Sequence, residues 1–249
     1  GGLHSTESNR AVFSDDDFVL VDADVASQYP SIILLLGLYP DALGAHFLAA
    51  YGSIKTDRLR AKKRAKAIKG EREALQSADP ADDAVRKAVL ALDQELLECQ
   101  VIDKSGKLSL NGVYGKLGSR YSALYAPHLM ISVTLTGQLA LLMLIERAER
   151  AGIPVVSGNT DGVLFRCPRD LYAGLKKDRL NPSPLEAICS QWEKDTTFDL
   201  EFGEYTKVFS QSVNSYFAIK PDGGHKRKGP LGNPWNKDPS DFDPVRGQL

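Results

Sequence analysis

The stretch "FVLVDADV", residues 18–25, constrains the fold of this chain more than any other feature. Its branched apolar residues predict a β-strand, and the two-residue period of a strand sends Asp22 and Asp24 to the same face. The strand is rich enough in apolar residues to be buried, yet it ends on two negative charges. The sequence therefore predicts a polar site where this strand ends.

Helix-forming composition is concentrated in five places. Residues 54–76 and 83–103 are rich in Lys, Arg, Ala, Glu and Leu on either side of a Pro-Asp turn, which predicts two antiparallel helices. A further helical stretch is expected to restart at residues 104–106, and a long amphipathic helix is expected over residues 134–151. A short helix is predicted after Pro30, through "SIILLL".

Two other stretches have the composition of tight β-hairpins. In "IPVVSGNTDGVLFRC" apolar runs flank Asn-Thr-Asp-Gly, and residues 213–228 repeat this arrangement around Asp-Gly-Gly. Hairpins separated by helices predict an α+β fold, with a largely antiparallel sheet flanked by helices and an inserted helical hairpin. The tail, residues 230–249, is rich in Pro, Asp and Asn and is expected to be extended.

Composition narrows the class of protein. The formal net charge of the 249 residues is -1, so any affinity for nucleic acid must come from how the charge is distributed. Three widely spaced cysteines, Cys99, Cys167 and Cys189, argue against a zinc site or a disulfide framework. The apolar runs are short for a membrane span and no signal peptide is recognisable, so we expect a cytoplasmic protein without a membrane partner.

A second acidic turn, "NTDG", follows another predicted strand. Two carboxylates that face each other across a sheet make a site for a hard cation, and Mg²⁺ needs only one or two of them besides water and substrate phosphate. Asp24 and Asp161 would suffice. The alternative is that Asp24 caps the next helix and Asp161 only supplies turn chemistry.

Three motifs, in order, resemble those of family B DNA polymerases. The stretch "DVASQYPSII", which starts at Asp24, is similar to the first motif of the family. The stretch "KLSLNGVYG", which starts at Lys107, is similar to the second motif, and "SGNTDGVLF" is similar to the third. A helical insertion separates the first two, as in the family. The similarity is closest to phage-encoded members, in which segments like "GGLHS" at the start and "KRKG" at residues 226–229 are also expected.

This resemblance implies a division of the chain. Residues 1–40 and 107–229 would form a polymerase palm, residues 41–106 a fingers helical hairpin, and residues 230–249 a tail. The exonuclease and thumb regions of such enzymes do not fit in this length, and the chain starts without Met. We therefore expect a piece of a larger polymerase, or a subunit that works with partner chains, whose isolated activity is weak or nil.

The resemblance also implies roles in template-directed DNA synthesis. Asp24 and Asp161 would hold two Mg²⁺ ions, with Mn²⁺ as a substitute, helped by the backbone carbonyl of Val25. Those ions would lower the pKa of the primer 3′ hydroxyl and neutralise the leaving pyrophosphate. The substrates would be deoxynucleoside triphosphates and primer-template DNA.

The residues that follow Asp24 would bind the nucleotide. The backbone N–H groups of Ser27, Gln28 and Tyr29 would meet the triphosphate at a helix start, where unpaired donors favour anions. Tyr29 would stack under the incoming sugar and exclude a 2′ hydroxyl. Without the motif, Tyr29 would be read as an aromatic core residue.

Basic residues of the insertion and of the second motif are further candidates. Lys62 and Lys66 share a helix face and match the basic pair with which the family grips the triphosphate. Lys107 and Asn111, likewise four apart, would meet the triphosphate and the nascent base pair. Tyr114 and the adjoining Gly115 would contact DNA. The basic residues of the last hairpin, Lys226, Arg227 and Lys228, would contact the phosphates of the DNA. The alternative for each basic run is a solvated surface.

Departures from the family pattern fall at the site itself. Asn159, beside Thr160, replaces the first aspartate of the third motif and removes one charge. Asp22 is a candidate to restore negative potential, a hypothesis motivated by strand periodicity. Gly112 replaces a serine, and a helical glycine costs about 1 kcal/mol relative to alanine, so a close approach of backbone or nucleotide is expected there. Gln28 replaces a leucine, and little effect is expected.

Two other function classes remain open. A non-catalytic nucleic-acid-binding palm scaffold would explain Asn159 as decay, although the retention of Asp24 and Asp161 counts against it. A metal nuclease with paired carboxylates would degrade DNA without added nucleotides, and it leaves Tyr29 and the lysine face unexplained.

Overall fold

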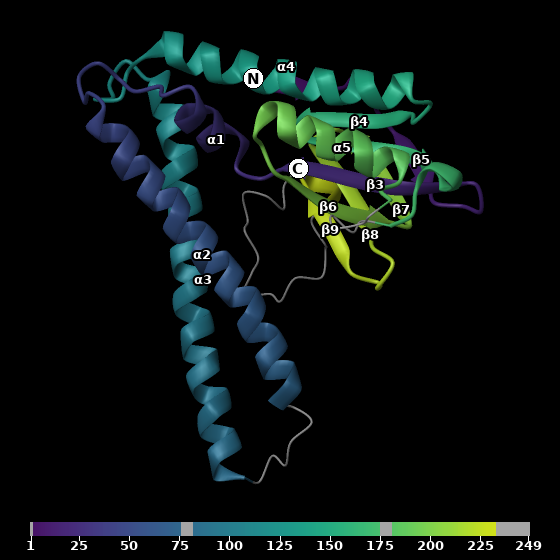
Figure 1. Cartoon of the computed structure of the whole chain (residues 1–249), viewed down its shortest axis with the longest axis horizontal. Coiled ribbons are helices and arrows are strands. Elements are labelled where there is room, and N and C mark those ends of the chain that lie inside the picture. Colours follow the sequence, from purple (N-terminus) through teal and green to yellow (C-terminus); the bar gives the residue numbers. More distant parts are fainter. Residues whose placement is uncertain (1, 76–81, 175–180, 233–249) are drawn as a thin grey trace. The chain divides into compact units, whose positions relative to one another are not determined.

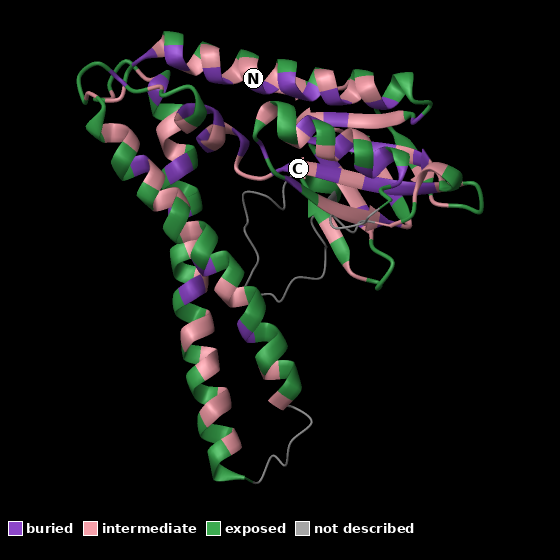
Figure 2. Cartoon of the chain, viewed as in Figure 1, coloured by how far each residue is buried: buried purple, intermediate pink, exposed green. Residues whose placement is uncertain are grey.

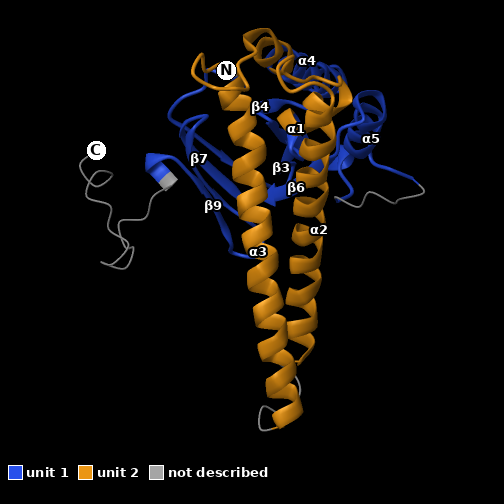
Figure 3. Ribbon diagram, turned by 90° about the vertical axis from the view of Figure 1, so that its left-hand side faces the viewer, with its two compact units in different colours: residues 1–28, 134–249 blue, residues 29–133 orange. Residues whose placement is uncertain are grey.

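The structure, a computed structural model, describes residues 2–75, 82–174 and 181–232. The chain folds into two compact units, coloured separately in Figure 3. Unit 1 comprises residues 1–28 and 134–249, and unit 2 comprises residues 29–133.

Part of what the sequence predicts lies outside the described residues. This holds for residues 76–81, which include most of the Pro-Asp turn, and for residues 233–249 of the tail. The tail's first residues, Pro230–Gly232, form a short 3-10 helix, η2.

Unit 1 is built on two sheets in which every pairing is antiparallel (Figure 1). This agrees with the predicted antiparallel pairing, but the strands divide between two sheets rather than one. The order is β1-β4-β5-β3-β6 in the first sheet and β2-β7-β8-β9 in the second. The strands are β1 (Leu3–His4), β2 (Arg10–Phe13), β3 (Phe18–Val25), β4 (Val155–Thr160), β5 (Gly162–Pro168), β6 (Leu200–Tyr205), β7 (Lys207–Ser212), β8 (Ser215–Ile219) and β9 (His225–Lys228).

Strand β3 has the predicted bounds and lies between β5 and β6. Val19, Leu20 and Val21 are all buried, and from Asp22 to Val25 partly exposed and buried residues alternate (Figure 2). Leu20 packs in a core cluster with Val208 and Ala218 of the second sheet. Asp22 and Asp24 follow Leu20 on this face, because a strand has a period of two.

Two long helices belong wholly or partly to unit 1. Helix α4 (Pro127–Arg150) starts seven residues before the predicted start at residue 134, and its residues from Thr134 onward belong to unit 1. Helix α5 (Pro184–Thr196) begins with a capping box and packs on α4, where the indole of Trp192 donates to the carbonyl of Ala140 at 2.7 Å. A 3-10 helix, η1 (Arg169–Leu171), follows β5.

Among the described residues, α4 is the one helix long and apolar enough to cross a membrane by length and composition. The sequence showed only a short apolar run in this region, whereas helix α4 itself has 24 residues. Leu141, Leu144 and Ala148 of this helix are fully buried in the protein. A core helix passes the same test of length and composition, so this feature is weak evidence for a membrane span.

Unit 2 contains the short helix α1 (Gln28–Leu35), whose first residue still belongs to unit 1, and a long helical hairpin, α2 (His46–Leu75) and α3 (Asp83–Leu117). The predicted restart near residues 104–106 is wrong, because α3 continues without a break. A Cβ at Gly106 would lie 3.0 Å from the Cβ of Arg58, so a glycine fits where the two helices pack closely.

Ion pairs and a small core join the two helices of the hairpin. Arg58 pairs with Asp103 at 2.9 Å, and Arg64 pairs with Glu95 at 2.7 Å. The core cluster between the helices is formed by Ala61, Ile68 and Cys99.

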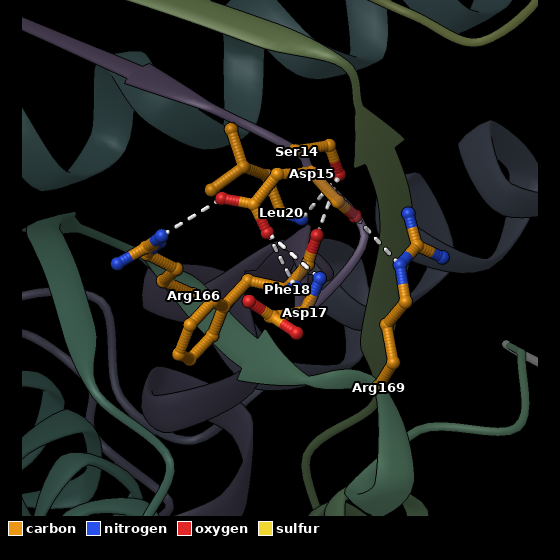
Figure 4. Close-up of polar contacts among 7 residues, drawn as sticks. All are labelled: Ser14, Asp15, Asp17, Phe18, Leu20, Arg166 and Arg169. Carbon is orange, nitrogen blue, oxygen red and sulfur yellow. Dashed lines mark hydrogen bonds and ion pairs between the residues drawn. The ribbon is translucent and has the colours of Figure 1, made fainter.

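Polar contacts hold the beginning of β3 against the end of β5 (Figure 4). Oδ1 of Asp15 accepts hydrogen bonds from the backbone N–H groups of Asp17 and Phe18 at 3.0 and 2.7 Å. Its Oδ2 pairs with Arg166 at 2.9 Å, and Nε of Arg169 donates to its backbone carbonyl at 2.7 Å. These contacts fix the first residues of β3, whereas the two aspartates lie near its last residue.

We expect this anchor to make unfolding acid-dependent. The Phe18 N–H, with help from Arg166, holds the pKa of Asp15 below its usual range. A lowered pKa stabilises the fold above the ordinary value of 3.8, and that contribution is lost as the pH falls through the lowered value.

Asp15→Asn should therefore lower the free energy of unfolding in urea at about pH 7 and have a smaller effect at about pH 3. The control is Asp16→Asn, which removes the same charge from the same loop. An equal effect of Asp15→Asn at both pH values would contradict the expectation.

Candidate metal and nucleotide site

The hairpin of β4 and β5 brings Asp161 to the end of β3. Asp161 joins its two strands, and Thr160, the last residue of β4, has a φ of 49°, in the left-handed region. The strand register pairs Asp24 with Gly162, and the backbone N–H of Val25 donates to the carbonyl of Asp161 at 2.6 Å. Two aspartates 137 positions apart in the sequence thus lie on adjoining backbones.

A lysine of the second sheet lies between the two aspartates of β3. Nζ of Lys226 is 2.7 Å from Oδ2 of Asp22 and 2.8 Å from Oδ2 of Asp24. The hydroxyl of Tyr205 also donates to Oδ2 of Asp22 at 2.8 Å. The side chain of Asp22 is 15% exposed and that of Asp24 is 42% exposed, so Asp22 is the inner carboxylate and Asp24 the outer one.

The pKa values reflect this crowding of charge. Burial and the charge of Asp24 raise the pKa of Asp22, against the opposing effects of Lys226 and Tyr205. Desolvation and the charge of Asp24 also raise the pKa of Asp161, although that residue as a whole is exposed. Burial by itself would lower the pKa of Lys226, but attraction and hydrogen bonds from Asp22 and Asp24 outweigh it and raise the pKa. The lysine is therefore a cation at neutral pH.

The carboxylate oxygens at this site are ligand atoms that suit a hard divalent cation. A Cβ at Gly162 would overlap Oδ1 of Asp24, so glycine leaves that space to the carboxylate. The ammonium of Lys226 already contacts Oδ2 of Asp22 and Oδ2 of Asp24, which shows that the site attracts positive charge. Among the described residues no three His, Cys, Asp or Glu gather as a metal cluster, so an ion would rely on two carboxylates, other oxygens and water.

Other predicted site residues of unit 1 lie around this pair. Ser27, with a φ of 52°, and Gln28 lie where α1 begins. The side chain of Gln28 is buried and its Nε2 donates to the carbonyl of Gly137 at 3.4 Å, so this side chain has a packing role that the sequence did not predict. Asn159 donates to the carbonyl of Val213 at 3.2 Å.

The three basic residues of β9 do not share one face. Lys226 faces the aspartates, and the charge of Lys228 acts on Asp161 by lowering its pKa. The guanidinium of Arg227 lies over the ring of Phe217, 5.3 Å from its centroid. The period of two along the strand explains this division.

Unit 2 holds the remaining predicted residues. The rings of Tyr29 and Tyr114 are in contact, with centroids 4.2 Å apart, so α1 and α3 meet at these two phenols. The other candidates of this unit are exposed, namely Lys62, Lys66, Lys107, Asn111 and Gly115.

Gly112 lies in open space in this structure. Among the described residues outside its own helix turn, no atom lies within 4 Å of the position that a Cβ would take there. The predicted close approach of another backbone is therefore wrong for this chain. Close approach of a nucleotide stays a prediction.

Sequence reasoning missed the link between Tyr205, Lys226 and the aspartates. Lys226 was expected to contact DNA phosphate because it belongs to a basic run. Its alternation with Arg227 along "HKRK" could have indicated that one of them points inward. Which strand faces β9 depends on pairings distant in sequence, which local patterns do not show.

Comparison with known proteins relates part of this chain to DNA polymerases. No family model matches the chain. DNA polymerase 1 of Sulfolobus acidocaldarius is 29% identical to it over 133 residues, which cover 53% of this chain and 14% of that protein. DNA polymerase 1 of Saccharolobus solfataricus is 30% identical over 144 residues, which cover 56% of this chain and 15% of that protein. This chain thus matches about one-seventh of the length of these relatives.

The fold is also similar to that of a solved structure. The family B DNA polymerase of Pyrobaculum calidifontis aligns with 90% of this chain and 29% of its own, with a TM-score of 0.51 and 17% identity. Sequence and fold together support a relationship with family B DNA polymerases. The relatives named here are archaeal.

The space at Gly162 makes a testable prediction about Asp24. Gly162→Ala should displace the Asp24 carboxylate and weaken the binding of Mn²⁺ by at least about tenfold, because the methyl group takes the place of Oδ1. Titration of the chain with Mn²⁺, followed by the electron paramagnetic resonance of the free ion, measures this.

The matched control for this variant is Gly203→Ala, where a Cβ would meet the Cβ of Asp22 at an ordinary 4.0 Å. Unchanged Mn²⁺ binding by a folded Gly162→Ala variant would show that Asp24 does not need this space.

Proposed function

We propose that this chain is the palm and fingers region of a family B DNA polymerase, which catalyses template-directed transfer of deoxynucleotides to a primer 3′ hydroxyl. The convergence of Asp24 and Asp161 on adjoining backbones, where the ammonium of Lys226 contacts Asp24, carries this proposal. The three ordered sequence motifs and the relationship with DNA polymerases support it.

The carboxylates of Asp24 and Asp161, with the backbone carbonyl of Val25, would hold two Mg²⁺ ions, or Mn²⁺ in their place. Such ions lower the pKa of a bound hydroxyl and neutralise developing phosphate charge. The protein's own part would be to keep the two carboxylates close together, and the register of β3 and β5, which sets Asp24 opposite Gly162, supports this. No side chain has to act as a strong base.

Further residues would bind the nucleotide and the DNA. The N–H groups of Ser27, Gln28 and Tyr29 at the start of α1 would donate hydrogen bonds to a phosphate, as helix N-termini favour anions. The triphosphate would also be neutralised by exposed lysines, and Asn111 would lie near the nascent base pair. The lysines are Lys62, Lys66 and Lys107, and the DNA contacts are Tyr114, Gly115, Arg227 and Lys228.

The organisation of the chain belongs to the same proposal. Residues 1–40 and 107–229 would be the palm and residues 41–106 the fingers, although residue 106 lies inside the continuous helix α3. We further propose a phage-encoded polymerase in the cytoplasm of a bacterial host, on the segments "GGLHS" and "KRKG". Exonuclease and thumb regions would complete it.

Primer extension tests the metal site. Asp161→Ala should reduce extension by the polymerase that contains this chain by at least about a thousandfold, because metal charge stabilisation is worth several kcal/mol and 1.36 kcal/mol is a factor of ten. Asp170→Ala, which removes an exposed carboxylate from η1, is the control and should extend normally.

Equal extension by the wild type and the Asp161→Ala variant would refute the proposed mechanism. No extension by either would favour a non-catalytic scaffold, and DNA degradation without nucleotides would indicate a nuclease.

Sugar selection tests the role of Tyr29. Tyr29→Val should lower the preference for dATP over ATP, as a ratio of kcat/KM, by at least about tenfold, because the smaller side chain leaves room for a 2′ hydroxyl. Tyr114→Phe keeps the ring that contacts Tyr29 and serves as the control. An unchanged ratio in Tyr29→Val would leave Tyr29 as a packing residue only.

A further inference from the structure

Lys226 occupies a position that a divalent cation would also favour. Its Nζ contacts Oδ2 of both Asp22 and Asp24 at hydrogen-bond distance. Asp24 is one of the two proposed metal-binding carboxylates, whereas Asp22 is not. The same lysine thus contacts a proposed metal-binding carboxylate and a second carboxylate that the proposed mechanism does not use.

We propose that Lys226 is a built-in counter-ion of the metal site, which a divalent cation displaces from Asp24 and which Asp22 and Tyr205 then hold. Asp22 and Tyr205 are positioning residues in this scheme, because they act through the lysine. The inference rests on the proposed function only in the assignment of Asp24 and Asp161 as metal-binding residues.

The geometry around Asp22 explains why the lysine would stay there. Asp22 is the less exposed carboxylate, and the Tyr205 hydroxyl already fixes its Oδ2 at 2.8 Å. The Lys226 ammonium also lies 5.9 Å from the centroid of the Tyr205 ring, within the range of a cation–π interaction. Asp24 is the more exposed of the two and lies beside Asp161, so it is the carboxylate that an incoming ion would reach.

The displacement needs only a side-chain movement. The neighbouring Arg227 lies over Phe217 on the opposite face, and β9 is paired with β8 along its whole length, so the backbone of β9 is fixed. The lysine stem has four methylene groups and can turn its ammonium from one oxygen to another. Asp22 lies two residues from Asp24 on the same face of β3, which keeps both oxygens within reach of the one ammonium.

Without Asp22, Asp24 would be the one of these two carboxylates left to Lys226, and the lysine would compete with the metal more strongly. Without Lys226, the metal would meet an unopposed pair of carboxylates. The two residues should therefore have opposite effects on metal affinity, and the effect of Asp22 should depend on the presence of Lys226. A carboxylate that only adds negative potential, or binds the ion directly, would show no such dependence.

The experiment measures Mn²⁺ binding to the 249-residue chain by electron paramagnetic resonance of the free ion, with no nucleotide or DNA present. Lys226→Met should bind Mn²⁺ at least about fivefold more tightly than the wild type, within the usual range of coupling between two sites. Lys226→Arg keeps the charge and should not tighten binding, and Lys220→Met is the control for loss of a lysine from the same hairpin.

The double variant tests the role of Asp22 and guards against loss of folding. Lys226→Met leaves a buried carboxylate without its cation, whereas Asp22→Asn with Lys226→Met removes both charges, and circular dichroism checks that each variant is folded. Asp22→Asn should weaken Mn²⁺ binding by a larger factor in the wild type than in the Lys226→Met background. The double variant should bind more tightly than Asp22→Asn alone.

Each other result overturns one part of the scheme. If neither Lys226→Met nor the double variant binds Mn²⁺ more tightly than its parent with the lysine, Lys226 is no counter-ion. If Asp22→Asn has the same effect in both backgrounds, Asp22 does not hold the lysine. Asp161→Asn with undiminished Mn²⁺ binding would instead refute the proposed metal site, so the two failures are distinguishable.

Discussion

The antiparallel register between β3 and β5 is the constraint on which the candidate site depends. It sets Asp24 opposite Gly162, so that the turn residue Asp161 lies next to the end of β3. A slip by one residue would send both aspartates of β3 to the opposite face, among the buried apolar side chains. The register is held at one end by the contacts of Asp15 and at the other by the bond from the Val25 N–H to the Asp161 carbonyl.

This register gathers like charges, and the protein compensates for them internally. Carboxylates that share a low-dielectric site repel each other and lose hydration, and both effects raise the pKa values of Asp22 and Asp161. Lys226 supplies an opposite charge from the second sheet, and Tyr205 supplies a hydroxyl. The two sheets are therefore joined by an ionic contact as well as by the apolar cluster around Leu20.

Local patterns in the sequence located β3 and the hairpins of β4–β5 and β8–β9, but they did not predict β1, β2, β6 and β7 or which strands are neighbours. The branched apolar residues of "FVLVDADV" predicted the bounds of β3, and the Asp-Gly signals located both hairpins. The continuity of α3 was missed because glycine propensity suggested a break at Gly106, where packing against Arg58 overrides it. The early start of α4 at Pro127 was missed as well, although proline suits a first helical turn.

Only those residues of the site that have a local signal in the sequence could be predicted. Asp24 and Asp161 could be named from the acidic residues at two strand ends, and Asp22 from the strand period. The partners of Asp22 could not, because Tyr205 and Lys226 come to it through strand pairings 183 and 204 positions away in the sequence. An isolated tyrosine and one lysine in a basic run carry no local signal of such a contact.

The unbroken course of α3 has a mechanical consequence. Its 35 residues make a rod of about 52 Å, and Lys107, Asn111 and Tyr114 lie near one end of it. Ion pairs from Arg58 and Arg64 of α2 hold the middle of α3 against α2. Because the three side chains lie on one continuous helix, any rotation of α3 as a whole would carry all three with it.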